Sequence, residues 1–247
     1  MQLTEIISEA YALFAPYTIG KTLSVCKACC ITDAEEAELV STPLRQVSRT
    51  LLQNAYYESA RNYSERELWE MKHFLPRVLE LVSGFEFPCH SLEITFTRLD
   101  LNQPDKWPAA ERQLLRNFAT TYVANCLARY PLPEGVALTE ILIMFGIAHF
   151  ELPGLLAQWS GASSDASLLH FKEFMLHDAS YSKTGAFTLT NPFTTTEVSA
   201  AFAAWLRDEQ VKQAFLTRIE SRLLNPQGLS EADTSELSWA YDILPTL

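Results

Sequence analysis

One apolar stripe that runs through a proline constrains the fold more than any other feature of this sequence. Apolar residues recur at alternating spacings of three and four on both sides of Pro76, and they are Leu68, Met71, Leu75, Val78 and Val82. This spacing is that of one face of an α-helix. A proline inside a helix removes one backbone hydrogen bond and bends the axis. Because the stripe stays in register, we expect one kinked helix that begins after Ser64 and ends at Gly84.

Hydroxyl residues followed three positions later by glutamate mark the starts of further helices. In such a capping box the hydroxyl accepts from a backbone N–H and the carboxylate reaches back to the cap. The spacing occurs at Thr32 with Glu35, Ser64 with Glu67 and Thr194 with Glu197, and Ser230 or Ser235 precedes a last apolar run. Glycine is scarce, with 8 residues against 12 prolines, as in chains of helices with short connections. We therefore predict an all-α fold, either an irregular multi-helix bundle or a degenerate α-solenoid, with at most one small hairpin.

Two segments fit this pattern less well. Leu92, Ile94 and Phe96 alternate with polar residues, but an isolated strand would have no partner, so we expect a helix there. The stretch from Lys183 to Phe193 favours an irregular connection or a small hairpin. Residues 1–247 are expected to form a single helical domain, with a soft division near 131–138.

The charge of the chain narrows its partners. Nineteen Lys and Arg against thirty Asp and Glu give a net charge of −11, which would repel a phosphate backbone. We expect no nucleic-acid ligand, and a protein partner that is basic. The acidic run Asp33, Glu35, Glu36 and Glu38 is the candidate surface for such a partner, and the alternative is a solvated helix start.

The five cysteines and the apolar segments indicate a cytoplasmic protein that does not enter a membrane. An odd number of cysteines and a start without a basic and then apolar leader favour a reducing compartment. The most apolar stretch, Leu138 to Trp159, is interrupted by charged residues and a proline. Such a stretch crosses a bilayer only at high cost, so we expect a buried helix.

A cysteine motif provides a candidate metal site. Cys26 and Cys29 have the two-residue separation with which thiolates bind one tetrahedral zinc. Cys89 and His90 could complete the ligand set, and His73 is a further candidate. The alternative is that these cysteines, with Cys30, are small buried apolar residues, as free cysteines commonly are.

Other pairs of polar residues are weaker candidates for chemistry. Glu70 and His73 have the Glu-x-x-His spacing of di-iron bundles, but such sites need two of these pairs. A deep pocket lined by His149, Glu151 or His170 would indicate an enzyme assembled from several helices, and His170 with His177 is a conceivable acid–base pair. The sequence has no nucleophile elbow and no glycine-rich phosphate loop.

Three short motifs carry a resemblance to a known group of proteins. They are Val25-Cys26-Lys27-Ala28-Cys29-Cys30, Thr42-Pro43-Leu44-Arg45, and Phe74-Leu75-Pro76-Arg77 with Leu79-Glu80-Leu81. In these motifs the first half of the chain resembles an uncharacterised all-helical family of bacterial proteins. That resemblance implies a bacterial cytosolic origin and assigns neither an activity nor a site.

Three functional hypotheses follow. The first is a non-enzymatic protein-interaction module of a bacterial cytosol, with an immunity protein that neutralises a basic toxin as its most specific form. The second is a helical protein with a structural zinc at the Cys/His site. The third is an enzyme whose site leaves little local trace in the sequence.

Overall fold

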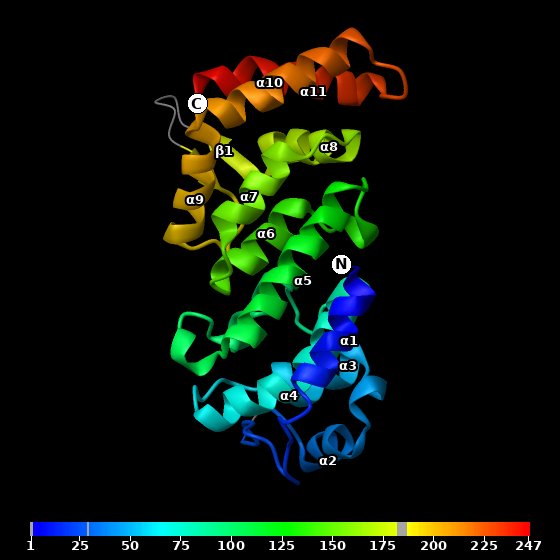
Figure 1. Cartoon of the computed structure of the whole chain (residues 1–247), viewed down its shortest axis with the longest axis vertical. Helices are drawn as coiled ribbons and strands as arrows, with labels where there is room; N and C mark the ends of the chain where they lie inside the picture. The colour runs from blue at the N-terminus through cyan, green and yellow to red at the C-terminus, as the bar shows by residue number, and fades with distance from the viewer. Residues whose placement is uncertain (1, 29, 182–186) are drawn as a thin grey trace. The chain divides into compact units, whose positions relative to one another are not determined.

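The computed structural model describes residues 2–28, 30–181 and 187–247, and α-helices dominate them (Figure 1). The described strands form one two-stranded antiparallel sheet. The predicted fold class, all-α with at most one small hairpin, is confirmed. The chain divides into two compact units, Met1–Thr121 and Tyr122–Leu247, which we describe separately. The prediction of a single domain stays a prediction.

The first unit consists of helices and short helical turns. The α-helices are α1 (Leu3–Leu13), α2 (Asp33–Ser41), α3 (Arg49–Leu52), α4 (Glu65–Ser83) and the first part of α5 (Ala109–Leu127). A π-helical turn (Gln53–Tyr57) follows α3, and 3₁₀ turns span Leu44–Gln46, Leu92–Ile94, Thr97–Leu99 and Pro104–Lys106. Helix α4 packs against α1.

Helix α4 is the central element of this unit. It continues through Pro76 without interruption and ends at Gly84, which confirms the prediction of one helix. The whole predicted stripe is buried, and Leu75 and Val78 are 0% exposed. Packing of the apolar face on both sides of the proline therefore outweighs the lost backbone hydrogen bond, whose helix penalty is about 3 kcal/mol.

Two other predictions for this unit have different outcomes. Thr32 and Glu35 form the predicted capping box at the start of α2. The segment around Phe96 forms two short 3₁₀ turns and no strand, so the expected helix is present there only in 3₁₀ form. Each turn is only three residues long. Phe96, which lies between the two turns, and Leu99 in the second turn are fully buried.

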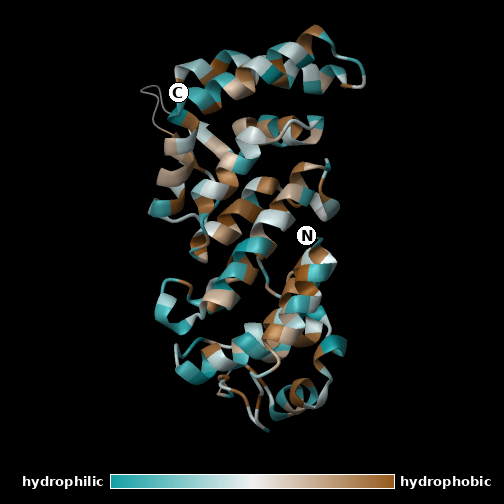
Figure 2. Cartoon of the chain, in the orientation of Figure 1, coloured by the Kyte–Doolittle hydropathy of each residue, from teal (hydrophilic) through white to brown (hydrophobic). Residues whose placement is uncertain are grey.

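The second unit contains the rest of α5 and the remaining helices. These are α6 (Leu138–Ile147), α7 (Leu152–Gly161), α8 (Asp165–Glu173), α9 (Thr196–Arg207), α10 (Glu209–Leu224) and α11 (Glu231–Ile243). A π-helical turn, Phe174–Asp178, extends α8, and 3₁₀ turns span Pro133–Gly135 and Leu244–Thr246. Helices α10 and α11 lie side by side (Figure 1). Figure 2 shows α6 mostly in the colours of apolar residues, in agreement with its burial.

The hairpin of this unit lies slightly before the segment that the sequence indicated. Strands β1 (Ala179–Tyr181) and β2 (Phe187–Leu189) pair antiparallel, with Ser180 opposite Thr188. Part of the predicted segment, residues 183–186, lies outside the described residues. The next helix, α9, is capped by Thr195, so the predicted capping box of Thr194 and Glu197 is wrong by one residue. Ser230 caps α11.

Aromatic side chains form the core of this unit around Trp159. Its indole is fully buried, donates to the Ser167 carbonyl at 2.9 Å and stacks on Trp205 with ring centroids 5.2 Å apart. Phe171 and Phe215 stack on each other beside it, with centroids 3.7 Å apart. The predicted apolar helix from Leu138 to Trp159 is thus two helices: α6, which is buried along most of its length, and α7, which buries Leu152, Leu155, Leu156 and Trp159 on one face. None of the described helices is both long enough and apolar enough to cross a membrane.

His170 is a buried imidazole on α8. The side chain is 3% exposed, and Nε2 lies 2.8 Å from the Arg129 carbonyl oxygen. Burial lowers the pKa of His170 from its ordinary 6.5, more than the nearby carbonyl groups and Glu173 raise it. The folded protein therefore favours the neutral imidazole.

The free energy of unfolding should fall as the pH is lowered below about 6.5, with a contribution from His170 of at most about 1.4 kcal/mol per pH unit. Stability falls on acidification because the unfolded chain binds a proton at His170 near pH 6.5, whereas the folded chain binds it only at lower pH. Urea unfolding between pH 5.5 and 7.5 measures this slope. His170→Gln should make the slope smaller, with His90→Gln at an exposed position as the matched control. An unchanged slope in His170→Gln would contradict the prediction.

Candidate functional site

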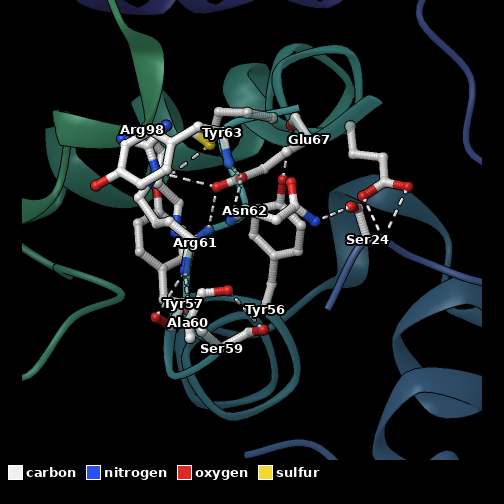
Figure 3. Close-up of polar contacts among 12 residues, drawn as sticks. Ser24, Tyr56, Tyr57, Ser59, Ala60, Arg61, Asn62, Tyr63, Glu67 and Arg98 are labelled. Carbon is white, nitrogen blue, oxygen red and sulfur yellow. Dashed lines mark hydrogen bonds and ion pairs between the residues drawn. The ribbon is translucent and has the colours of Figure 1, made fainter. Parts of the chain in front are cut away.

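The candidate site is the loop of residues 58–64, which joins the π-helical turn to α4 in the first unit (Figure 3). Glu67, in the first turn of α4, anchors this loop and is only 1% exposed. Its carboxylate accepts from the backbone N–H groups of Asn62 at 2.9 Å and Tyr63 at 2.7 Å. Ser64 caps the helix through the Glu67 N–H, but the Glu67 side chain turns to the loop instead of completing the predicted capping box.

Two arginines balance the charge of this buried carboxylate. Arg61 Nε lies 3.0 Å and Arg98 Nη1 lies 2.7 Å from Glu67 Oε1. Arg98 also donates to the carbonyl groups of Tyr57 and Ser59 and is 5% exposed. Charge-assisted bonds of this kind are about twice as strong as neutral ones. The loop backbone is therefore held from both sides by ion-paired groups.

Arg61 connects the loop to a second segment of the chain. Its guanidinium reaches both carboxylate oxygens of Asp100, at 2.6 and 3.1 Å, and donates to the Thr97 carbonyl at 2.9 Å. Burial alone would lower the pKa of Arg61, but the bonds to Asp100 and Glu67 outweigh it and the pKa is raised. The bidentate geometry fixes the planar guanidinium in one orientation.

The segment of residues 22–26 packs against the same loop. The Ser24 N–H donates to both oxygens of the buried Glu70 carboxylate, at 2.8 and 3.0 Å. Cys26 N–H donates to the Ser59 hydroxyl at 2.6 Å, and the Asn62 amide donates to the Ser24 hydroxyl. Burial raises the pKa of Glu70, which the Ser24 N–H and Arg66 offset only in part. These contacts order two loops against each other.

Tyr63 is the most exposed aromatic residue of this anchored loop. Its backbone is left-handed, with φ at 56°, and its side chain is 73% exposed. The ring lies over the Arg61 guanidinium, 4.3 Å from ring centroid to Cζ. A left-handed backbone is uncommon for a bulky residue and costs on the order of 1–3 kcal/mol. The anchored loop therefore holds an exposed aromatic ring in a conformation that the isolated residue would not prefer.

Trp69 is a second exposed aromatic residue close in the sequence. It is 46% exposed, its Nε1 donates to the Thr18 carbonyl at 2.8 Å, and its ring meets Tyr17 edge-on. Arg66 lies one helical turn before it and has a half-exposed side chain, paired with Glu70 at 2.8 Å. Tyrosine, tryptophan and arginine are the residue types most enriched in the energetic centres of protein interfaces.

The predicted zinc ligands fall in different surroundings. Cys89 is buried, and burial raises the pKa of its thiol to about 12, so the thiolate that zinc requires is disfavoured. Cys26 is half-buried, and His90 is exposed. The described residues contain no group of three or more side chains that could hold a metal ion. Cys29 lies outside the described residues, so the zinc site stays a prediction.

The predicted acidic surface on α2 contains one buried member. Asp33 and Glu38 are exposed and Glu35 is half-buried, whereas Glu36 is 3% exposed. Glu36 accepts from the Leu23 N–H at 2.6 Å and pairs with Lys27 at 2.6 Å. Burial alone would raise the pKa of Glu36, but these two donors outweigh it and lower the pKa. Glu36 therefore stabilises the loop before α2, and the exposed acidic surface consists of the other members.

The other candidate pairs of polar residues either bind the backbone of neighbouring segments or differ in exposure. Glu70 binds the Ser24 backbone, and His73 Nδ1 lies 2.8 Å from the Tyr17 carbonyl oxygen. His149 and Glu151 are exposed, as is His177, while His170 is buried. The di-iron spacing therefore positions two side chains that hold the segment of residues 17–24.

Sequence reasoning missed the residues that build this site. Tyr63, Arg61 and Arg98 belong to no local motif, and the spacing of Ser64 and Glu67 indicates only a capping box. The sequence signal that could have indicated the site is the capping spacing of Ser64 and Glu67 with Arg61 and Asn62 just before them. The second partner of Glu67, Arg98, is 31 residues away and leaves no local signal. Comparison of the chain with models of protein families, with curated proteins and with solved structures found no match.

Proposed function

We propose that the chain is a non-enzymatic protein-interaction module of a bacterial cytosol, and that Tyr63 is the centre of its contact surface. The observation that supports this is an exposed, left-handed tyrosine on a loop that buried ion pairs hold in place. Burying these charges costs several kcal/mol that only good pairing recovers. Among the described residues, the Tyr63 ring packs on the Arg61 guanidinium and is otherwise largely exposed, so a partner is the simplest reason to expose it.

Ordering of the loop before binding supports the same proposal. Association loses about 0.5–1.5 kcal/mol for each side chain that it immobilises. The backbone of Asn62 and Tyr63 is already fixed by Glu67, and the Tyr63 ring rests on Arg61. A partner that binds this loop should therefore lose little free energy to ordering it, because the fold already fixes the loop.

The partner that the overall charge fits best is a basic protein. A net charge of −11 would attract such a protein over a distance of several ångströms and raise its association rate. The most specific form of the proposal is an immunity protein that neutralises a basic toxin. The buried thiols of Cys89 and Cys126, which form no disulfide, fit a reducing cytosol.

Tyr63→Gly should weaken partner binding about thirtyfold without unfolding the protein. Loss of a central tyrosine weakens an interface by about 2 kcal/mol or more, or about thirtyfold in Kd. Glycine adopts a positive φ freely, so stability should stay within about 1 kcal/mol of the wild type. Pull-downs from the native cytosol at low and high ionic strength, followed by titration with the purified partner, measure the effect.

The matched control is Trp239→Ala, which removes an aromatic residue that is 37% exposed on α11. It should leave the same partner bound at the same stoichiometry. Recovery of no stoichiometric partner by the wild type at either ionic strength would overturn the proposal. Equal recovery by Tyr63→Gly and the wild type would show that the contact surface lies elsewhere.

A further inference from the structure

An irregular segment of the first unit is bound to the first turns of α4, and we call its residues 17–24 the strap. It contains no helix or strand. Within the described ranges, no backbone–backbone hydrogen bond involves residues 18–25. Of the strap residues, all of which the structure describes, Leu23 alone is buried, and its N–H donates to Glu36 of α2 at 2.6 Å. The strap therefore lacks the hydrogen-bonded ladder that keeps a helix or a sheet closed.

Side chains of α4 bind the start of the strap through its backbone. His73 Nδ1 lies 2.8 Å from the Tyr17 carbonyl oxygen, and Trp69 Nε1 donates to the Thr18 carbonyl at 2.8 Å. The Tyr17 hydroxyl donates to Glu111 of α5 at 2.6 Å. The start of the strap is therefore attached to two helices of the unit.

The end of the strap is bound by the same face of α4. Arg66 donates to the Thr22 carbonyl, and the Ser24 N–H donates to the Glu70 carboxylate at 2.8 and 3.0 Å. Positions 66, 69, 70 and 73 of α4 have the spacing of one helical face. One stripe of side chains thus holds the backbone of the strap from its start to its end.

The strap also contacts the loop that carries Tyr63 (Figure 3). The Asn62 amide donates to the Ser24 hydroxyl, which lies 3.4 Å from the Ser64 hydroxyl. Just beyond the strap, the Cys26 N–H donates to the Ser59 hydroxyl at 2.6 Å. The end of the strap and the loop of residues 58–64 therefore share hydrogen bonds, and movement of the strap breaks contacts of the loop.

Opening of the strap would return Glu70 to water. Burial raises the pKa of Glu70, so the ionised carboxylate loses solvation that its bonds to Ser24 and Arg66 recover only in part. Leu23 is the buried apolar side chain that opening would expose. A segment with few buried contacts and no backbone ladder opens locally at a free energy well below that of global unfolding.

We propose that the strap opens and closes as one unit on α4, and that its closure contributes to the order of the Tyr63 loop. Closure would then be a control on the contact surface, because a partner of Tyr63 binds the ordered loop at a lower entropic cost. This consequence for binding rests on the function proposed above. The coupling between strap and loop is a property of the free chain and is measured without a partner.

Amide hydrogen exchange of the full chain at constant pH, with Arg66→Ala, tests the proposal. The Arg66 side chain is 55% exposed, so its loss should loosen the strap and leave the unit folded. We expect the protection of the Ser24 N–H to fall about tenfold, and that of the Tyr63 N–H to fall with it by about threefold or more. The Val78 N–H, in the middle of α4, should keep its protection because the opening is local.

Arg77→Ala is the matched control on the same helix. Arg77 donates to the Val47 carbonyl at 2.7 Å and pairs with Glu80 at 2.7 Å, so it binds the backbone of a different segment. Its loss should leave the protection of the Ser24 and Tyr63 N–H groups unchanged.

Asn62→Ala tests the connection between strap and loop. In this background, Arg66→Ala should still lower the protection of the Ser24 N–H but should change that of the Tyr63 N–H less than it does in the wild type. Unchanged Ser24 protection in Arg66→Ala would overturn the proposal, and so would Tyr63 protection that does not fall with it. Failure to find a partner for Tyr63 would leave these exchange results as they are.

Discussion

Replacing Glu67 by alanine should lower the free energy of unfolding of the first unit by about 3–5 kcal/mol, the cost of breaking a buried ion pair from one side. The substitution leaves Arg98 buried and, among the residues that the structure describes, with no carboxylate at contact distance. It also removes the acceptor of the Asn62 and Tyr63 N–H groups. Urea unfolding followed by tryptophan fluorescence measures the effect, since Trp69 and Trp107 report on this unit.

Glu65→Ala is the matched control, two residues away in the same helical turn. The Glu65 side chain is 90% exposed and lies 3.5 Å from Lys106, so its removal should change stability by less than about 0.5–1 kcal/mol. If Glu67→Ala were as mild as Glu65→Ala, the buried network would not be what holds the loop.

Leu75→Ala should lower the free energy of unfolding by about 2–5 kcal/mol, because it removes a fully buried side chain and leaves a cavity. The value reports how well the apolar face of α4 is packed immediately before Pro76. The same urea unfolding experiment measures it.

Leu224→Ala is the corresponding control, since that leucine at the end of α10 is 81% exposed. It should change stability by less than about 0.5 kcal/mol. A cost for Leu75→Ala near that of the control would mean that the stripe through the proline contributes little to the core.

Local signals in the sequence predicted much of the fold. The stripe through Pro76 and the capping box of Thr32 and Glu35 depend on residues within one or two helical turns, and both are present. The capping box expected at Thr194 failed because Thr195 can cap equally well, and a spacing rule cannot choose between adjacent threonines. The short 3₁₀ turns around Phe96 have no periodicity that would distinguish them from a helix.

The candidate site could not be predicted from local signals, because it depends on contacts between residues that are far apart in the sequence. Glu67 is a good capping residue in isolation, but its carboxylate pairs with Arg61 and with Arg98, which is 31 residues later in the chain, and it therefore anchors the loop. The exposure of Tyr63 follows from that anchor and not from its own neighbours.

The buried ion-pair network also limits which substitutions this sequence can accept during evolution. Glu67, Arg61, Arg98 and Asp100 form one electrically balanced set. A change at one of them leaves an uncompensated charge, whereas a joint replacement by apolar residues of similar volume can be neutral. Evolution should therefore exchange these four positions together or keep them all. In a distant relative, the joint presence of the four residues would mark the loop even where the rest of the sequence has diverged.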